Sequence, residues 1–539
     1  MSAAPSPWPA RDGRHLLVSG GQMAALEQQL FASGLPVEAL MEKAALAVAQ
    51  RIRQQWNAHL AAHGAVVLVG PGHNGGDGLV IARELHLAGV AVAIWSPFER
   101  HKPLTEGHLR HALWLGIPRL GAPPEPGGQA LWIDALFGIG QSRPPGAALE
   151  TLLAERRRQH PGVLVAVDGP TGLCCDSGRL LGASAACAHT TYAIGLLKTG
   201  LVQDPALAWV GQLERIDLGL PAALLHQLPA DQPLGLHPAD LADLPPLALD
   251  PAAGKYGRGR LLVVAGSERY RGAAAPALLG ADASGCGSLE ATLPKLVAEA
   301  LWRWLPHAVV RQELGSDGGG HLQLGALGEA PLERLDAVLL GPGIGCSKGE
   351  PAAAEHLAWQ RLQAFPGLLV LDADGLNRIQ ADWLTQRRGP TWITPHAGEF
   401  GRLFPALAGE APLEAAREAA RQSGAVVLLK GARTVIAAPD GQRWQLLETT
   451  PTAARTGLGD VLAGFAAGRG AMAMASGAGG DGRWLAGAAL AHATVGLELQ
   501  QRSIVPSPER VAHWLQTGPR AEHASQNGGD RFQERPWLA

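Results

Sequence analysis

Residues 66–78, VVLVGPGHNGGDG, are the stretch that most constrains the fold. The apolar run 66–69 predicts a buried strand, and five glycines occupy the next nine positions before a helical pattern, LVIARELHLAG. Glycine leaves little bulk between the backbone and a ligand and permits a positive φ. The unpaired N–H groups at the start of the following helix favour a phosphate. The stretch therefore predicts an open α/β sheet with a ligand at the carboxyl ends of its strands.

Two other interpretations of this turn are possible. The string also satisfies G-x-G-x-x-G, but a dinucleotide fold of the usual kind needs an acidic residue about 20 positions further on. The next strand-like run, VAVAIWSPF, ends near Ser96 without a carboxylate. Alternatively, the turn only packs the helix against the strand. Asn74 and Asp77 are poor packing choices beside so many glycines, so we favour a nucleotide-like ligand held in another way.

Composition limits the class of protein. The chain has 539 residues, of which 47% are hydrophobic, and its net charge is −3. This length predicts two to four domains at about 150 residues each, and the charge implies neither a nucleic acid nor a membrane as partner. The five cysteines include no C-x-x-C pair, which is typical of a reducing compartment. Without a visible signal peptide or spanning segment, we expect a soluble, cytoplasmic protein.

Strand-like and helical runs alternate in both halves, which predicts an α/β fold of two doubly wound domains with mostly parallel sheets. The first domain is expected over residues 1–220. Prolines crowd residues 221–239, which we interpret as a linker. The second domain is expected over residues 240–517, and the polar residues 518–539 are expected to form a disordered tail.

Three strand ends of the first half carry oxygen-bearing side chains. Asp134 follows the run WI, Asp168 follows VAV, and Thr171 lies in the turn behind Asp168. Because parallel strands end at one edge of a sheet, these groups are expected to meet Asn74 there. An amide, a carboxylate and a hydroxyl form an all-oxygen set that suits a hard cation, and Asp168 remains as a candidate general acid or base. The alternative is that each aspartate only caps the turn that follows it.

The second half contains RTGLGDVLAG, residues 455–464. Gly457 and Gly459 allow N–H groups to converge at a helix start and hold a transferring phosphoryl group, and Asp460 can accept a proton from an attacking hydroxyl. The alternative is an ordinary helix N-terminus, where an aspartate is favoured by the dipole. The motifs KGART, TPHAGEF, DADGLN and GPGIG favour phosphoryl transfer, since each follows an expected strand.

The motifs GPGHNGGDG, VEALMEKA, DALFGIG and VDGPTG resemble the N-terminal domain of bifunctional NAD(P)H-hydrate repair enzymes over about residues 15–220. The motifs of the second half resemble the C-terminal domain of the same family over about residues 240–517. The resemblance implies a Rossmann-like three-layer sandwich that epimerises the hydrate. It also implies a ribokinase-like domain that phosphorylates the S epimer of the hydrate and then eliminates phosphate, which restores NADH or NADPH.

The resemblance also implies roles for individual residues. Potassium would be bound by Asn74, Asp134 and Thr171, and the catalytic residues would be Asp168 and Asp460. The hydrates of NADH and NADPH would contact His73, Asn74, Gly75, Gly76, Asp77, Gly138, Ile139, Gly140, Gln141, Ser142, Arg143, Pro144, Ala273, Gly343 and His396. ADP or ATP, with magnesium on its phosphates, would contact Lys430, Gly431, Ala432, Arg433, Thr434 and Gly459.

Two other functions compete with repair. The chain is also compatible with a small-molecule kinase of the ribokinase-like class, whose first half is a regulatory ligand-binding domain; this function predicts a stable phosphorylated product. A non-catalytic scaffold would bind the cofactor without turnover. Repair instead predicts free phosphate and a restored reduced cofactor. We expect a homo-oligomer in solution.

Overall fold

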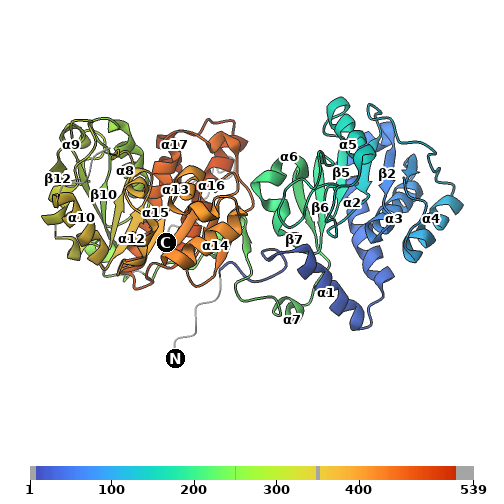
Figure 1. The fold of residues 1–539 in the computed structure, drawn as a ribbon, viewed down its shortest axis with the longest axis horizontal. Coiled ribbons are helices and arrows are strands. Elements are labelled where there is room, and N and C mark those ends of the chain that lie inside the picture. Colours follow the sequence, from blue (N-terminus) through green and yellow to red (C-terminus); the bar gives the residue numbers. More distant parts are fainter. Residues whose placement is uncertain (1–7, 249, 330, 347–352, 518–539) are drawn as a thin grey trace, which may run out of the picture. The chain divides into compact units, whose positions relative to one another are not determined.

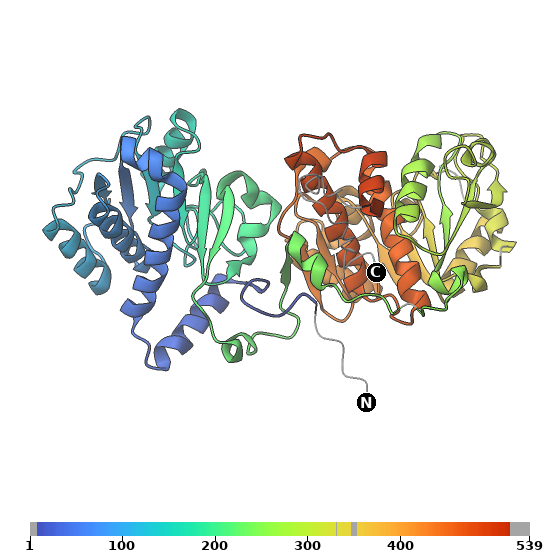
Figure 2. The same ribbon diagram turned by 180° about the vertical axis from the view of Figure 1, so that it is seen from behind.

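The computed structural model describes residues 8–248, 250–329, 331–346 and 353–517. The chain divides into two compact units (Figures 1 and 2). One unit consists of residues 11–232. The other consists of residues 8–10 together with the described residues from 233 onward. The expected tail, 518–539, lies outside the described residues.

The first unit contains a six-stranded sheet in which every neighbouring pair of strands is parallel. Along the sheet the strands are β3 (Val92–Trp95), β2 (Ala65–Val69), β4 (Leu131–Ala135), β5 (Leu164–Val167), β6 (Thr190–Ile194) and β8 (Gln212–Ile216). Two short strands, β1 (Leu17–Val18) and β7 (Leu197–Lys198), pair separately. The order runs outward in both directions from β2 and β4, so β2 and β4 lie where a doubly wound sheet binds its ligand.

Helices cover both faces of this sheet. They are α1 (Gly20–Ala32), α2 (Val37–His63), α3 (His73–Leu87), α4 (Pro103–Trp114), α5 (Ala147–Gln159), α6 (Leu207–Val210) and α7 (Ala222–Leu225). Helix α3 packs on the face that carries Val67, because Gly78 of α3 lies against that side chain. Helix α5 packs on the opposite face, where Leu149 and Leu153 join a core cluster with Leu68. The unit is therefore a three-layer sandwich.

The second unit contains a ten-stranded sheet. Its strands are, in spatial order, β12 (Val309–Leu314), β11 (Ser288–Pro294), β10 (Arg260–Val264), β13 (Ala337–Leu340), β14 (Leu368–Leu371), β15 (Thr391–Ile393), β16 (Val426–Leu429), β17 (Val435–Ala437), β18 (Arg443–Leu446) and β9 (Leu234–Leu236). Only the pairings of β17 with β16 and with β18 are antiparallel. The strands that carry the expected motifs are parallel, so their carboxyl ends meet at one edge.

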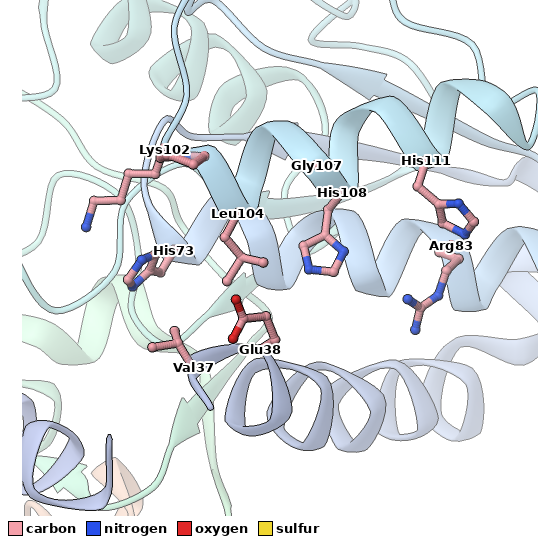
Figure 3. A pocket seen from close by; sticks show the side chains of 10 residues that line it. Val37, Glu38, His73, Arg83, Lys102, Leu104, Gly107, His108 and His111 are labelled. Carbon is pink, nitrogen blue, oxygen red and sulfur yellow. The ribbon is translucent and has the colours of Figure 1, made fainter. Parts of the chain in front are cut away.

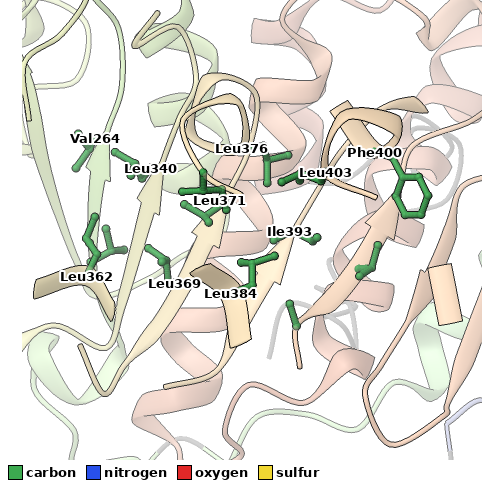
Figure 4. Close-up of a cluster of buried hydrophobic side chains, with 14 of the residues drawn as sticks. Val264, Leu340, Leu362, Leu369, Leu371, Leu376, Leu384, Ile393, Phe400 and Leu403 are labelled. Carbon is green, nitrogen blue, oxygen red and sulfur yellow. The ribbon is translucent and has the colours of Figure 1, made fainter. Parts of the chain in front are cut away.

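Helices also cover both faces of the second sheet. They are α8 (Ala274–Ala283), α9 (Lys295–Leu301), α10 (Ala353–Ala364), α11 (Asp374–Asn377), α12 (Ala381–Thr385), α13 (Ala397–Leu403), α14 (Pro412–Ser423), α15 (Leu458–Ala475), α16 (Gly482–Gln501) and α17 (Pro508–Thr517). Gly470 of α15 lies against Leu368 of β14. The neighbouring Leu369 and Leu371 point to the other face, where they join the core beneath α10 and α14 (Figure 4).

The sequence-based expectations differ from the structure in two places. Residues 221–239, expected as a linker, hold α7 and β9, and β9 pairs with β18. The strands β8, β9, β11, β12 and β18 were not expected. They carry polar residues or lie near sheet edges, and both features weaken a buried-strand pattern.

None of the helices described here is long and apolar enough to cross a membrane.

Leu371 gives a direct test of the second core. Its side chain is fully buried, so Leu371→Ala should lower the free energy of unfolding of this unit by about 2–5 kcal/mol through lost transfer energy and a residual cavity. Denaturant unfolding of the full chain, followed by tryptophan fluorescence, measures this change. Leu357→Ala is the matched control because Leu357 is 48% exposed. Equal losses from the two substitutions would contradict the assignment of Leu371 to the core.

Candidate functional site

The glycine-rich turn of the first unit belongs to the start of α3. The helix begins at His73, so Asn74 and Asp77 lie in its first turns. The sequence had suggested instead that both residues belong to the turn before the helix. A β-carbon added at Gly70 would lie 1.6 Å from the carbonyl oxygen of Leu136, and one at Gly75 would lie 2.0 Å from that of Gly70. Glycine is therefore required at these positions for close packing of the helix onto the strand ends.

Asp134 and Thr171 form a buried hydrogen-bonded pair behind this helix start. The Asp134 carboxylate accepts the Thr171 backbone N–H at 2.8 Å and the Thr171 hydroxyl at 2.8 Å. The hydroxyl also accepts the Phe137 N–H at 3.2 Å. Burial raises the pKa of Asp134 to about 6, although the hydrogen bonds from Thr171 act in the opposite direction. The two side chains join the carboxyl end of β4 to the turn after β5.

Asp168 follows β5 with a φ of 68°, an uncommon backbone conformation for a residue other than glycine. This backbone bend presents its carboxylate to Lys198, whose Nζ lies 2.5 Å away and is fully buried. The carboxylate also accepts the backbone N–H groups of Ile194 at 3.3 Å and Ile139 at 3.4 Å. All three contacts place a hydrogen-bond donor against the carboxylate of Asp168.

The loop 138–144 closes one side of the site. Its Gln141 side chain donates to the carbonyls of Phe137 at 3.3 Å and Pro170 at 3.2 Å, and accepts the Gly172 N–H at 2.6 Å. Gln141 therefore ties this loop to the turn after β5. Its amide is already used in these contacts, so it supports the shape of the loop.

These elements enclose a cavity of about 1010 Å³ in the first unit. From the set expected at the sequence level, it is lined by His73, Asn74, Asp77, Gly138, Ile139, Gly140, Gln141, Ser142, Arg143, Pro144 and Asp168. Gly75 and Gly76 are buried and are not among the lining residues, because they pack on Gly70 and Met41. Asp134 and Thr171 are also fully buried and lie outside the lining.

Asn74 is the residue of this site that points most clearly to an absent group. Its amide oxygen and nitrogen are both buried and have no hydrogen-bond partner. A buried amide without a partner is costly, and such an atom calls for a ligand, ion or water. The oxygens of Asn74, Asp134 and Thr171 are of the type that a hard cation selects. The residues therefore fit the potassium ion implied by the resemblance.

Several lining residues of this cavity were not found from the sequence. Glu27 of α1 lines it, and apolar lining comes from Phe31, Met41, Phe98 and Ile194. Lys198 lies four residues beyond the end of β6, so the strand-end rule that found Asp168 could have found it. Glu27 carries no such signal, because it lies within an ordinary helical pattern.

The acidic groups of the cavity influence one another. Burial, followed by the charge of Asp168, raises the pKa of Glu27 to about 7, whereas Lys198 lowers it. Burial raises the pKa of Asp77 well above its usual value, and the charges of Asp168 and Glu27 act in the same direction. Two carboxyl groups near the ion pair of Asp168 and Lys198 thus bind their protons more tightly than usual.

A smaller cavity of about 730 Å³ adjoins the first and shares Val37, His73 and Lys102 with it. Figure 3 shows Glu38 among its histidines, with Arg83 at the end away from Lys102. Arg83 is already ion-paired with Glu42 at 2.7 Å and with Glu84 at 2.9 Å. Arg83 therefore adds little uncompensated positive charge to this cavity.

The second unit repeats the pairing of a lysine with a strand-end aspartate. Asp372 follows β14 and is 1% exposed, and Lys430 follows β16. The Lys430 ammonium forms an ion pair with the Asp372 carboxylate, which also accepts the Thr394 hydroxyl at 2.8 Å. Three strand ends, those of β14, β15 and β16, therefore meet in one polar cluster.

Asp460 lies in the first turn of α15, an 18-residue helix. Gly457 precedes the helix with a φ of 86° and leaves its N-terminus without a side-chain cap. Burial, followed by the charge of Asp372, raises the pKa of Asp460 to about 7, while Lys430 lowers it. A β-carbon added at Gly459 would lie 3.5 Å from the Lys430 ammonium, so the helix start lies beside the ion pair.

His396 has a structural role that the sequence did not reveal. It caps α13: its Nδ1 accepts the N–H groups of Gly398 at 3.0 Å and Glu399 at 3.3 Å, and the Glu399 carboxylate accepts the His396 N–H at 2.9 Å. The ring remains 63% exposed, so its Nε2 side can meet a ligand. Burial raises the pKa of Glu399, and the charge of Asp372 acts in the same direction.

The other expected residues of the second unit lie in two groups. Gly343 has a φ of 66°, and a β-carbon there would lie 2.4 Å from that of Ala273, so these two expected substrate contacts are neighbours. Residues 430–434 connect β16 to β17, and the Thr434 hydroxyl donates to the Gly431 carbonyl at 3.2 Å. Gly431 and Ala432 are exposed, and Arg433 and Thr434 are half-buried.

Comparison with known proteins gives consistent matches for both units. A family model described as NAD(P)H-hydrate dehydratase matches residues 261–516, and one described as YjeF-related protein N-terminus matches residues 37–200. The bifunctional NAD(P)H-hydrate repair enzyme of Gloeobacter violaceus is 45% identical over 458 residues, which cover 83% of this chain and 87% of that protein. The enzyme of the same name from Synechocystis is 40% identical, over 86% of this chain and 87% of that protein.

Among solved structures, the ADP/ATP-dependent NAD(P)H-hydrate dehydratase of Bacillus subtilis, co-crystallised with ATP and Mg²⁺, is similar to part of the chain. It has a TM-score of 0.44 and 27% sequence identity, and the match covers 52% of this chain and 95% of that one. The two family matches and the identity over most of the chain agree with the two doubly wound units. The chain belongs to the family of bifunctional NAD(P)H-hydrate repair enzymes, and it epimerises and dehydrates hydrated nicotinamide cofactors.

Proposed function

We propose that the cavity of residues 11–232 epimerises the hydrate, with Asp168 as a catalytic residue, and that Asp460 starts dehydration in the second unit. The observation that supports this division most strongly is the position of Asp460. It lies at an uncapped helix N-terminus, beside the ion pair of Lys430 and Asp372. A base beside an anion-binding helix start is the arrangement that phosphoryl transfer to a hydroxyl needs.

The dehydration would proceed in two steps. Asp460 accepts the proton of the hydrate hydroxyl, and the hydroxyl oxygen attacks the terminal phosphorus of an adenine nucleotide, whose bridging oxygen leaves with the bonding electrons. The phosphorylated carbon then loses phosphate together with the C–O electron pair, and the neighbouring carbon loses a proton. The ring double bond returns, and the products are the reduced cofactor, phosphate and the shortened nucleotide. The raised pKa of Asp460 suits a base that works near neutral pH.

The nucleotide would bind along residues 430–434 and Gly459, with its phosphates at the start of α15. ADP and ATP both fit this proposal. Magnesium would accompany those phosphates and offset their charge beside Asp372, Asp374 and Asp460, since clustered carboxylates suit such an ion. In the same unit, the hydrate would lie against Ala273, Gly343 and the exposed side of His396.

Potassium would bind in the first unit to the oxygens of Asn74, Asp134 and Thr171. It would supply a positive charge next to a cavity that holds several carboxylates, and it would satisfy the buried amide oxygen of Asn74. We also propose that the protein is cytoplasmic and self-associates. Exposed Leu296, Trp302 and Val309, near the edge strand β12, support association, and light scattering in solution tests it.

Substitution of Asp460 tests the dehydration step. Asp460→Asn keeps the size of the side chain and removes the proton acceptor, so dehydration should slow by about 10²–10⁴-fold. In the unsubstituted protein, the dehydration rate should rise as the pH increases through about 7, because only the ionised base is active. The measurement is recovery of reduced-cofactor absorbance together with phosphate release, starting from the hydrate and either ADP or ATP.

The matched control for this experiment is Asp382→Asn, because Asp382 also lies in the first turn of a helix but is exposed. It should leave dehydration unchanged. Dehydration by Asp460→Asn at the original rate would refute the assignment. Accumulation of a stable phosphorylated hydrate would instead support the kinase alternative.

Removal of potassium tests the cation site. At equal ionic strength, potassium should raise the thermal unfolding temperature of the first unit relative to choline, because an ion that binds only the folded state stabilises it. The corresponding gain in the free energy of unfolding should approach about 2.7 kcal/mol at a potassium concentration 100 times the dissociation constant. Asn74→Ala should abolish the increment, and Asn57→Ala, at an exposed position, should keep it. A potassium effect that survives in Asn74→Ala would place the ion elsewhere.

A further inference from the structure

We propose that Glu27 is a second catalytic residue of the epimerase cavity and acts as the general acid opposite Asp168. The inference rests on the proposed role of Asp168. Glu27, Asp77 and Asp168 reach the same cavity from three different elements, which are α1, α3 and the turn after β5. The cavity therefore brings together carboxyl groups from separate elements, as a reaction that uses both an acid and a base requires.

Helix α1 holds Glu27 in a defined position. Ser19 caps the helix and forms a reciprocal capping box with Gln22, and the Gly20 N–H donates to Asp176 at 2.6 Å. Met23 is buried one helical turn before Glu27, so both side chains lie on the face that packs against the unit. The half-buried Glu27 thus continues the buried face of α1, whereas Gln28 and Gln29 are exposed.

Glu27 and Asp168 have opposite environments. Asp168 accepts hydrogen bonds from the Lys198 ammonium and from the Ile194 and Ile139 N–H groups, which stabilise its charge. Within the described part of the chain, Glu27 has no hydrogen bond or ion pair. A half-buried carboxyl group near the charge of Asp168 binds its proton more tightly. Such a difference between the environments of two carboxyl groups assigns one as the acid and the other as the base.

Other charged and titratable groups also face this cavity. They are His73 and Asp77 on α3, Lys102 before α4, and Arg143 in the loop 138–144, whereas Lys198 in β7 is fully buried against Asp168 and does not line the cavity. Lys198 lowers the proton affinity of Glu27, but burial and Asp168 outweigh it, and the pKa of Glu27 is raised to about 7. Glu27 therefore holds a proton at neutral pH and can also release it.

The reaction balances with these two residues alone. In the hydrate, the hydroxyl is on the carbon next to the ring nitrogen. Glu27 protonates this hydroxyl, the C–O bond breaks with its electrons leaving on oxygen as water, and the nitrogen lone pair forms a C=N⁺ bond. A water molecule then adds to the opposite face of that carbon, the C=N⁺ electrons return to nitrogen, and Asp168 accepts the proton. Solvent water then reprotonates Glu27 and takes up the proton from Asp168, which prepares both groups for the next turnover.

The pH dependence of epimerisation tests this assignment. The experiment uses the full chain with one purified hydrate epimer and no nucleotide, and the spontaneous rate is subtracted. In the unsubstituted protein, kcat/KM should fall as the pH rises through about 7, because the acid must be protonated. Glu27→Gln should lower the rate by about 10²–10⁴-fold and remove this alkaline decrease. Glu27→Asp should retain the decrease at a shifted pH.

Isotope exchange supplies a second readout. In water enriched in ¹⁸O, each epimerised molecule should carry one solvent oxygen, whereas epimerisation without label would overturn the proposed chemistry. An unchanged alkaline decrease in Glu27→Gln would overturn the role of Glu27. If Glu27→Gln unfolds, as its melting temperature would show, Glu27→Asp decides: an unshifted alkaline decrease there also overturns the role.

Glu38→Gln is the matched control, since Glu38 borders the neighbouring cavity and is not among the residues that line the epimerase cavity (Figure 3). It should keep both the rate and the pH profile, and loss of the alkaline decrease there would overturn the assignment to Glu27. If Asp168 has no catalytic role, Asp168→Asn should epimerise the hydrate at the normal rate, while the Glu27 variants still change the rate at alkaline pH. Failure of the role of Asp168 is therefore distinguishable from failure of the role of Glu27.

Discussion

A lysine that pairs with a buried strand-end aspartate organises each half of this protein. In the first unit Lys198 holds Asp168, and in the second Lys430 holds Asp372. Each ion pair places a lysine ammonium against a buried carboxylate, where an isolated charge would be costly. Burial, together with the charge of this aspartate, raises the pKa of a nearby carboxyl group, which is Glu27 in the first unit and Asp460 in the second. Each site thus gains a group that exchanges protons near neutral pH.

The parallel sheet explains why these groups meet. Carboxyl ends of neighbouring parallel strands share one edge, so a short side chain after one strand reaches the residues after the next. The close contact between Gly70 and Leu136 brings α3 down onto this edge, and Gly457 begins α15 with a φ of 86°. In both units these glycines allow close packing or begin a helix, and the polar contacts come from the side chains around them.

The sequence was sufficient to predict the two doubly wound units and most of the polar site residues. Asp134, Asp168 and Asp460 follow clear strand or helix signals, so local pattern reveals them. Residues whose role depends on tertiary packing were not predicted. Glu27 lies on an amphipathic helix whose distance from the strand ends is not encoded locally, and the partner of Lys430 is 58 residues away in the chain. Strands that carry polar residues or lie near a sheet edge were not predicted for the same reason, because pairing with neighbouring strands and not a local pattern determines them.

Infrared difference spectroscopy tests the central claim most directly, since a protonated carboxyl group absorbs separately from a carboxylate. The account predicts two protonated carboxyl signals that titrate near pH 7, one lost in Glu27→Gln and the other in Asp460→Asn. Asp168→Asn and Asp372→Asn should each keep the signal of the neighbouring acid but shift its titration to lower pH, because the raising charge is gone. Spectra in which Glu27→Gln and Asp460→Asn lose no signal that titrates near pH 7 would contradict the account.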